Sequence, residues 1–137
     1  MTNETNFLDL SDDQVKNMLE NLISEGFCKY SFKIGNIDVS IKSLTWEENE
    51  LLVKKIASIP RETIDAGQEK KRDVTVNEFN TVATAYTLDT HLVSFNNDTS
   101  VDINKLSKNV VSIIAQKIAK LENTINEKLL SVAEIKN

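Results

Sequence analysis

Residues 30–57 read YSFKIGNIDVSIKSLTWEENELLVKKIA and decide the predicted fold. Apolar and polar residues alternate strictly on both sides of Gly35-Asn36, a pattern typical of two half-buried strands joined by a tight turn. A glycine at the first turn position can adopt the positive φ that a two-residue hairpin loop needs. We therefore predict a β-hairpin with one apolar face. That face needs a cover, because an isolated hairpin is only marginally stable in water.

A capped helix is predicted directly after the hairpin. Thr45 and Glu48 have the spacing of a capping box, in which the hydroxyl and the carboxylate bind free backbone NH groups. Apolar residues then recur at helical spacing, and Pro60 ends the helix because proline disfavours helical geometry in the residue before it. We expect this helix to cover the hairpin, with Trp46 in the core or at its edge. A contact between Trp46 and a partner is the alternative.

A further helix is predicted before the hairpin. Ser11 and Gln14 form a second capping box, apolar residues follow on one helical face, and Gly26 suits the left-handed position after a helix. Residues 1–10 form an acidic lead-in whose apolar side chains either stay free or pack against the body. Residues 11–60 are thus expected to contain a helix, the hairpin and the capped helix.

The second half is predicted to be helical after a polar connection. Residues 61–74 carry charges of both signs, which is typical of a solvent-exposed loop. The helical part, residues 75–137, begins with a third capping-box spacing at Thr75. Residues 92–95 either continue this helix or form a short extended piece, and a turn is indicated at residues 96–98 in both cases.

The longest periodic signal lies at the C-terminus. Asp102 is the predicted cap of a long amphipathic helix whose apolar residues mostly fall three or four apart. Its first half is expected to pack on the core, whereas residues 121–135 extend beyond what a small domain needs to cover. That part is either a core helix with a frayed end or an apolar stripe for a partner helix or a neighbouring subunit.

Length and charge limit the class of protein. The 137 residues suit a single α+β domain, with a small antiparallel hairpin packed against about four helices. No apolar run is long enough to cross a membrane and no signal peptide is recognisable, so cytoplasmic synthesis is expected. The net charge of -5 argues against a nucleic-acid partner, because phosphate binding needs a concentrated basic surface. Cys28, the single cysteine, is predicted to be a buried thiol.

The residues suggest no catalytic, cofactor-binding or metal site. His91 is the single histidine, no nucleophile turn surrounds the nearby serines, and one histidine with scattered carboxylates supplies too few metal ligands. Three glycines, at positions 26, 35 and 67, cannot assemble a phosphate-binding loop. We therefore predict that the protein is not an enzyme and that His91 is a packing or surface residue.

Two short phrases, SLTWEE at residues 43–48 and HLVSFN at residues 91–96, occur in an informative order. The first follows a small β element and has a "pLT-x-x-E" helix start; the second follows a helix and has the form "hL-x-S-f-N". This order resembles the small tail assembly chaperones of tailed bacteriophages and the related baseplate-hub assembly proteins of contractile-tailed phages. The resemblance covers roughly residues 27–125.

The resemblance implies a non-catalytic protein-binding factor in tail or baseplate morphogenesis, first of all a tail assembly chaperone. It would hold an apolar segment of a tail protein, such as the tape measure, in the host cytoplasm. Two alternatives are a structural baseplate or hub subunit retained in the virion and an acidic adaptor or inhibitor unrelated to phages. The binding groove is expected between the hairpin's covering helix and the second-half helices, with oligomer formation through the C-terminal helix. The candidate contact residues are Trp46, Phe79, Tyr86, Phe95, Leu121, Ile125 and Leu129.

Overall fold

The computed structural model describes residues 6–59 and 69–129, with side chains from residue 78 onward in the second range. Four α-helices and a three-stranded antiparallel sheet confirm the predicted α+β class. A 3₁₀ turn, η2, precedes the last helix and a π-helical turn, η3, continues it. The elements are α1 (Asp12–Glu25), β1 (Lys29–Ile34), β2 (Ile37–Lys42), α2 (Trp46–Ala57), α3 (Glu69–His91), β3 (Leu92–Phe95), η2 (Ile103–Lys105), α4 (Lys108–Thr124) and η3 (Ile125–Leu129).

The predicted hairpin forms the larger part of the sheet. Strands β1 and β2 pair in register from Lys29 opposite Lys42 to Ile34 opposite Ile37, and Gly35 adopts a φ of 61° in the connecting turn. Residues 92–95 are extended rather than helical, and as β3 they pair antiparallel with β2. The strand order is therefore β1-β2-β3, with the second hairpin strand in the centre.

The positive φ of Gly35 makes the turn sensitive to substitution. No atom lies within 4 Å of where a Cβ would stand, so backbone strain is the only penalty for a larger residue. We expect Gly35→Ala to lower the free energy of unfolding by about 1 kcal/mol, because an L-residue is disfavoured at this φ. Chemical denaturation followed by circular dichroism measures the change. Asn36→Ala is the control, since Asn36 has no positive φ; an equal loss in both variants would contradict the explanation.

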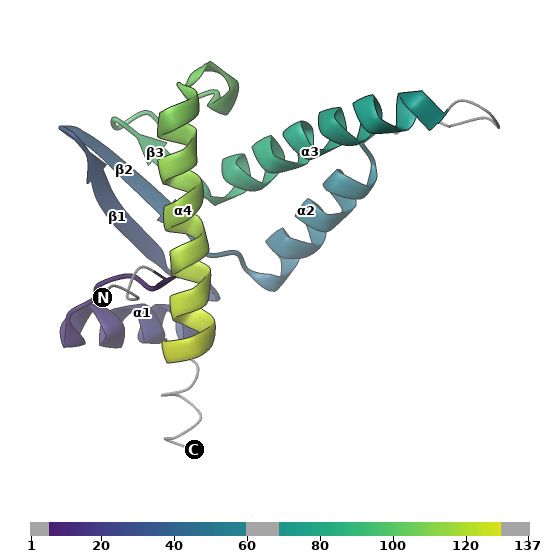
Figure 1. Cartoon of the computed structure of the whole chain (residues 1–137). Helices are drawn as coiled ribbons and strands as arrows, with labels where there is room; N and C mark the ends of the chain where they lie inside the picture. The colour runs from purple at the N-terminus through teal and green to yellow at the C-terminus, as the bar shows by residue number, and fades with distance from the viewer. Residues whose placement is uncertain (1–5, 60–68, 130–137) are drawn as a thin grey trace.

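The apolar face of the sheet is covered by α4, not by α2. Val39 and Ile41 of β2 are fully buried and belong to one core cluster with Ile114 and Ile118 of α4. Figure 1 shows α4 lying along the sheet while α2 and α3 extend away from it. The prediction that the helix after the hairpin covers the sheet is therefore wrong. The longest amphipathic helix takes that place, because it offers the largest apolar stripe.

The end of α4 and the turn η3 are also part of the core. The predicted assembly stripe is buried, with Leu121 and Leu129 at 0% exposure and Ile125 at 7%. The N-terminal lead-in lies against it, since the backbone NH of Leu8 donates to Thr124 Oγ1 at 2.9 Å. Leu8 itself is buried. Of the two alternatives for this stretch, the described part is thus core; residues 130–137 lie outside the described residues.

Several predicted boundaries differ from the observed ones. Both N-terminal capping boxes, at Ser11 and Thr45, are present, and Gly26 has a φ of 87°. Helix α3, however, begins at Glu69, so the predicted start at Thr75 is wrong; residues 61–68 of the predicted loop lie outside the described residues. The predicted cap of the last helix at Asp102 is also wrong. Asp102 caps the 3₁₀ turn η2, and Ser107 caps α4.

Candidate functional site

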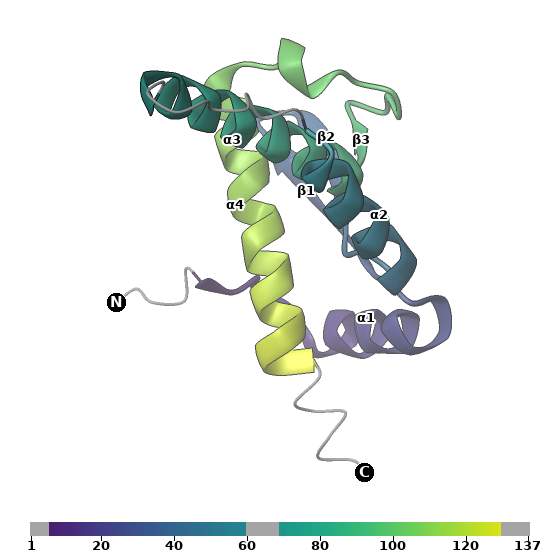
Figure 2. The same ribbon diagram turned by 90° about the vertical axis from the view of Figure 1, so that its right-hand side faces the viewer.

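Helices α2 and α3 form an arm that projects from the sheet and α4, here called the α2–α3 arm (Figures 1 and 2). The two helices pack against each other, and the ammonium group of Lys55 lies 4.4 Å from the ring centre of Tyr86. On α2 only Leu52 is buried, and this helix packs mainly against α3. Much of the apolar surface of α2 is therefore left in solvent.

The exposed apolar side chains of α2 are the most distinctive surface feature of the described residues. Trp46 is 81% exposed, Leu51 is 59% exposed and Val53 is 53% exposed. The expectation that Trp46 lies in the core or at its edge is wrong, because the side chain of Trp46, at the first helical position after the Thr45 cap, lies largely in solvent. The alternative, a partner contact, needs such exposure.

A cleft of about 460 Å³ lies beside Trp46, where α1, α2, α3 and α4 come together; we call it the Trp46 cleft. Figure 2 shows α1, α2 and α4 arranged around this region. Its apolar lining includes Leu22 at the end of α1, Leu44 before the cap, and Ile125 in η3. Its polar lining includes Asn49 and Asn126, so a ligand would meet both kinds of surface.

His91 and Glu122 also line the Trp46 cleft. His91 is buried, and its Nδ1 lies 2.7 Å from the carbonyl oxygen of Lys42. Because a carbonyl only accepts, Nδ1 carries the proton and joins the end of α3 to the end of β2. This contact confirms a packing role for His91. Glu122 Oε2 lies 4.0 Å from Nδ1, too far for a hydrogen bond.

The start of α2, at the rim of the cleft, is stabilised by a charged capping box. Thr45 N donates to Glu48 Oε1 at 3.0 Å, Glu48 N donates to Thr45 Oγ1 at 3.1 Å, and the Lys42 ammonium group also bonds to the Glu48 carboxylate. Partial burial favours the neutral acid, but the bonds from Lys42 and Thr45 together hold the pKa of Glu48 below its usual range. The ionised form is therefore favoured in the folded protein.

We expect Glu48→Gln to destabilise the protein at neutral pH and not at low pH. A carboxylate with a depressed pKa stabilises the folded state above its unfolded pKa, and this contribution disappears as the pH falls through the folded pKa. Because the side chain is 38% exposed, solvent screening limits the effect to less than about 1 kcal/mol. Denaturation curves of both proteins at acidic and neutral pH measure it. Curves whose separation does not shrink on acidification would contradict the role of the charge.

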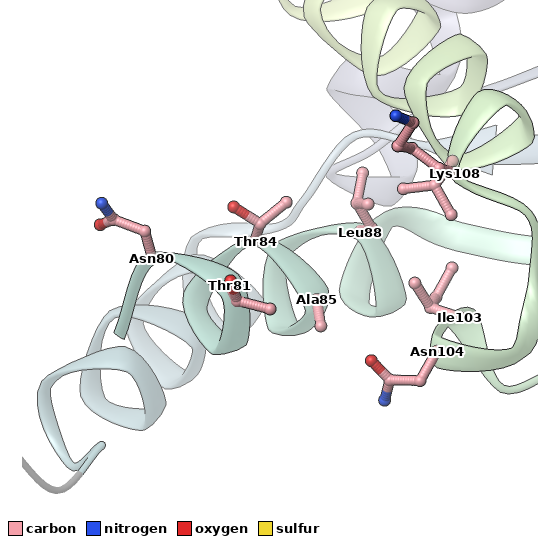
Figure 3. A pocket seen from close by; sticks show the side chains of 9 residues that line it. Asn80, Thr81, Thr84, Ala85, Leu88, Ile103, Asn104 and Lys108 are labelled. Atoms are coloured by element: carbon pink, nitrogen blue, oxygen red, sulfur yellow. The ribbon is translucent and has the colours of Figure 1, made fainter. Parts of the chain in front are cut away.

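A second cleft, of about 370 Å³, lies between α3 and the start of α4. Figure 3 shows side chains of α3, among them Thr84 and Leu88, near those of η2 and α4. Leu88 and Ile103 are buried there, and Lys108 is the one charged residue of the lining. The walls thus combine an apolar floor with a rim of amide and hydroxyl side chains.

The remaining candidate contact residues do not form one surface with Trp46. Phe79 and Tyr86 are half-buried on α3, and the ammonium group of Lys55 lies over the ring of Tyr86. Phe95 is half-buried in β3 and packs against the core cluster. Of the seven candidates, only Trp46 is a strongly exposed side chain. The Trp46 cleft lies between α2 and the helices of the second half, where a groove was expected, although α2 does not cover the hairpin.

Sequence reasoning missed Leu51 and Glu122. Leu51 and Leu52 are adjacent in the helix and therefore point in different directions, but the sequence does not say which of the two is buried. Glu122 follows the buried Leu121 and faces the cleft at the end of the apolar stripe, a position that becomes visible only when α2 is placed beside α4.

Among the side chains that the structure describes, in residues 6–59 and 78–129, no group of three or more histidine, cysteine or acidic side chains lies close enough together to hold a metal ion. Cys28 is buried as predicted, and burial raises the pKa of its thiol. The described helices include none with the length and apolar character needed to cross a membrane.

Comparisons with protein-family models, with curated proteins and with solved structures find no match to this chain. The function is therefore inferred from the side chains that the fold leaves exposed and from the two phrases at residues 43–48 and 91–96.

Proposed function

We propose that this chain is a non-catalytic protein-binding factor whose α2 helix docks on a partner. The observation that carries the proposal is the exposure of Trp46, Leu51 and Val53 on a helix that packs mainly against α3. Tryptophan is enriched among the residues that dominate binding energy at protein interfaces. Covering such a ring stabilises a complex, because a large aromatic side chain removes roughly 150–250 Å² of its surface from water.

We further propose that the partner is a bacteriophage tail or baseplate protein. The resemblance of residues 43–48 and 91–96 to tail assembly chaperones supports this context. The first phrase forms the connection from β2 and the first turn of α2, and the second forms the end of α3 and strand β3. Both contribute to the lining of the Trp46 cleft, through Thr45 and Trp46 on one side and His91 on the other. Their proximity is consistent with one shared binding region.

In the first version of this proposal the protein is a tail assembly chaperone in the host cytoplasm, holding an apolar segment of a tail protein such as the tape measure. The exposed side chains of α2 would cover that segment until assembly. The alternatives are a baseplate or hub subunit that stays in the particle and an acidic adaptor unrelated to phages. All three use the same surface and differ in the partner.

The surface is tested by substitution and co-purification. The tagged chain is isolated from phage-producing cells as wild type, as Trp46→Ser, and as Ile113→Thr. Ile113 is the matched control, because it is a 37% exposed apolar residue of α4 outside the Trp46 cleft. We expect Trp46→Ser to recover about tenfold less of the tail partner, a loss typical of an interface hot spot. Undiminished recovery by a folded Trp46→Ser variant would exclude α2 as the docking surface.

Mass spectrometry of purified particles, compared with the lysate from which they came, distinguishes the chaperone from the structural subunit. Absence from the particle and abundance in the lysate support the chaperone. A fixed low copy number in the particle supports the structural subunit. If the chain co-purifies with no tail or baseplate protein, the phage context is wrong.

A further inference from the structure

Lysine side chains cover several aromatic rings of the described residues. An ammonium group over an aromatic face is attracted by the negative charge density of the ring, and tryptophan gives the strongest interaction of this kind. Trp46 is the one described tryptophan, and no lysine of the described residues lies over it. The observed lysine and ring pairs, with distances to the ring centre, are Lys42 and Phe27 (4.7 Å), Lys55 and Tyr86 (4.4 Å), Lys117 and Phe32 (5.5 Å), and Lys128 and Phe7 (4.6 Å).

The Trp46 cleft also contains a carboxylate without a cationic partner. Glu122 is the one acidic residue of its lining, and neither lysine nor arginine belongs to that lining. The Glu122 side chain is 44% exposed, so it is open to a ligand. Its nearest titratable neighbour is His91, whose Nδ1 proton is already engaged by the Lys42 carbonyl oxygen. Within the described residues, Glu122 therefore makes no salt bridge with a lysine or arginine.

We propose that the Trp46 cleft receives a lysine or arginine side chain of the partner, which pairs with Glu122 and lies against the indole of Trp46. This inference rests on the proposed function and names the chemistry of the partner segment. The apolar lining by Leu22, Leu44 and Ile125 covers the aliphatic stem of such a side chain, while its charged head reaches the carboxylate. The partner segment therefore carries a basic residue among apolar ones.

Charge complementarity supports a basic rather than an acidic segment. The whole chain has a net charge of -5, and the rim of the cleft continues into the acidic first turn of α2 with Glu47. An acidic side chain would be repelled by Glu122, whereas a cation gains from both Glu122 and the ring. An uncharged apolar side chain would leave the Glu122 carboxylate partly desolvated and unpaired.

The test selects short random peptides from a display library on the wild-type chain, on Glu122→Gln and on Glu122→Lys. One peptide selected on the wild type is then titrated against each variant, and the fluorescence of Trp46, the only tryptophan of the chain, reports binding. Glu127→Gln is the matched control, because it removes the same charge from an exposed residue of η3 outside the cleft.

We expect wild-type selection to enrich lysine or arginine at one position among apolar residues. Glu122→Gln should bind the selected peptide about two- to fivefold more weakly, the size of one partly exposed ion pair, and Glu127→Gln should bind it as the wild type does. Glu122→Lys should enrich acidic residues instead. Added salt should reduce the difference between wild type and Glu122→Gln.

Apolar peptides without a basic position, bound equally by wild type and Glu122→Gln, would overturn the inference and leave α2 as a protein-binding surface. Failure to enrich any peptide would also overturn it. The proposed function is judged separately by the co-purification of Trp46→Ser, so the two failures are distinguishable.

Discussion

Replacement of Leu121 by alanine lowers the free energy of unfolding by about 3 kcal/mol, as expected for a leucine removed from a closely packed core. Leu121 is 0% exposed and belongs to the cluster that includes Val39 and Ile41 of the sheet. Alanine removes the apolar contacts of the side chain and leaves a cavity that the surrounding helix and sheet fill only in part. Urea denaturation followed by circular dichroism gives the midpoint and slope from which the change is obtained.

The matched control is Ile113→Ala on the same helix. Ile113 is 37% exposed, so the same kind of truncation removes less buried surface and should lower the free energy of unfolding by only about 1 kcal/mol. A small effect at Leu121, equal to that at Ile113, would indicate that the stripe faces solvent. That result would restore the prediction of an assembly surface on the C-terminal helix.

Thr124→Val is expected to lower the free energy of unfolding by about 2 kcal/mol, although valine has nearly the same shape. The Thr124 hydroxyl is buried, accepts from the Leu8 backbone NH at 2.9 Å and donates to the Lys120 carbonyl oxygen at 2.7 Å. Without it, the buried NH of Leu8 has no acceptor and the N-terminal segment separates from α4. Hydrogen exchange at the Leu8 amide should therefore accelerate together with the loss of stability.

Thr124→Ser separates the hydrogen bond from the packing of the methyl group. Serine keeps the hydroxyl, so Leu8 exchange should stay slow even though some apolar contact is lost. Equal acceleration of Leu8 exchange in both variants would show that the methyl group, rather than the hydroxyl, fixes the N-terminal segment.

Local features of the fold were predictable because they depend on residues close in sequence. Alternation around Gly35 predicted the hairpin, and hydroxyl and acid or amide spacings at Ser11 and Thr45 predicted two helix starts. The start of α3 was not predictable in the same way. A polar stretch with charges of both signs is compatible with a loop and with a helix, so the boundary at Glu69 has no decisive local signal.

The cover of the sheet could not be predicted from periodicity. The stripe of α2 around Leu52 and the stripe of α4 around Leu121 both have helical spacing, and spacing does not say which stripe meets the sheet. The outcome depends on β3, which continues the sheet beyond β2, and on the N-terminal residues around Leu8, which close over the end of α4. Both are contacts between residues far apart in sequence.

The candidate contact residues were chosen by residue type, and the sequence did not show which of them would be exposed. Trp46 was named both as a core residue and as a candidate contact; its exposure excludes the core position, and the contact stays a prediction. Leu121, Ile125 and Leu129 were named for the same apolar character, yet they are buried. Glu122 gave no signal, because its significance depends on the absence of a nearby cation and on the position of α2 beside it.

The bond between Leu8 and Thr124 also has a consequence for the order of events during synthesis. These two residues are 116 positions apart, and the third strand and the covering helix α4 both follow the hairpin in the chain. While the ribosome is still translating the second half, the apolar face of the hairpin has neither its neighbouring strand nor its cover. Folding of this domain is therefore completed only after α4 has emerged, and the nascent hairpin is exposed to aggregation until then.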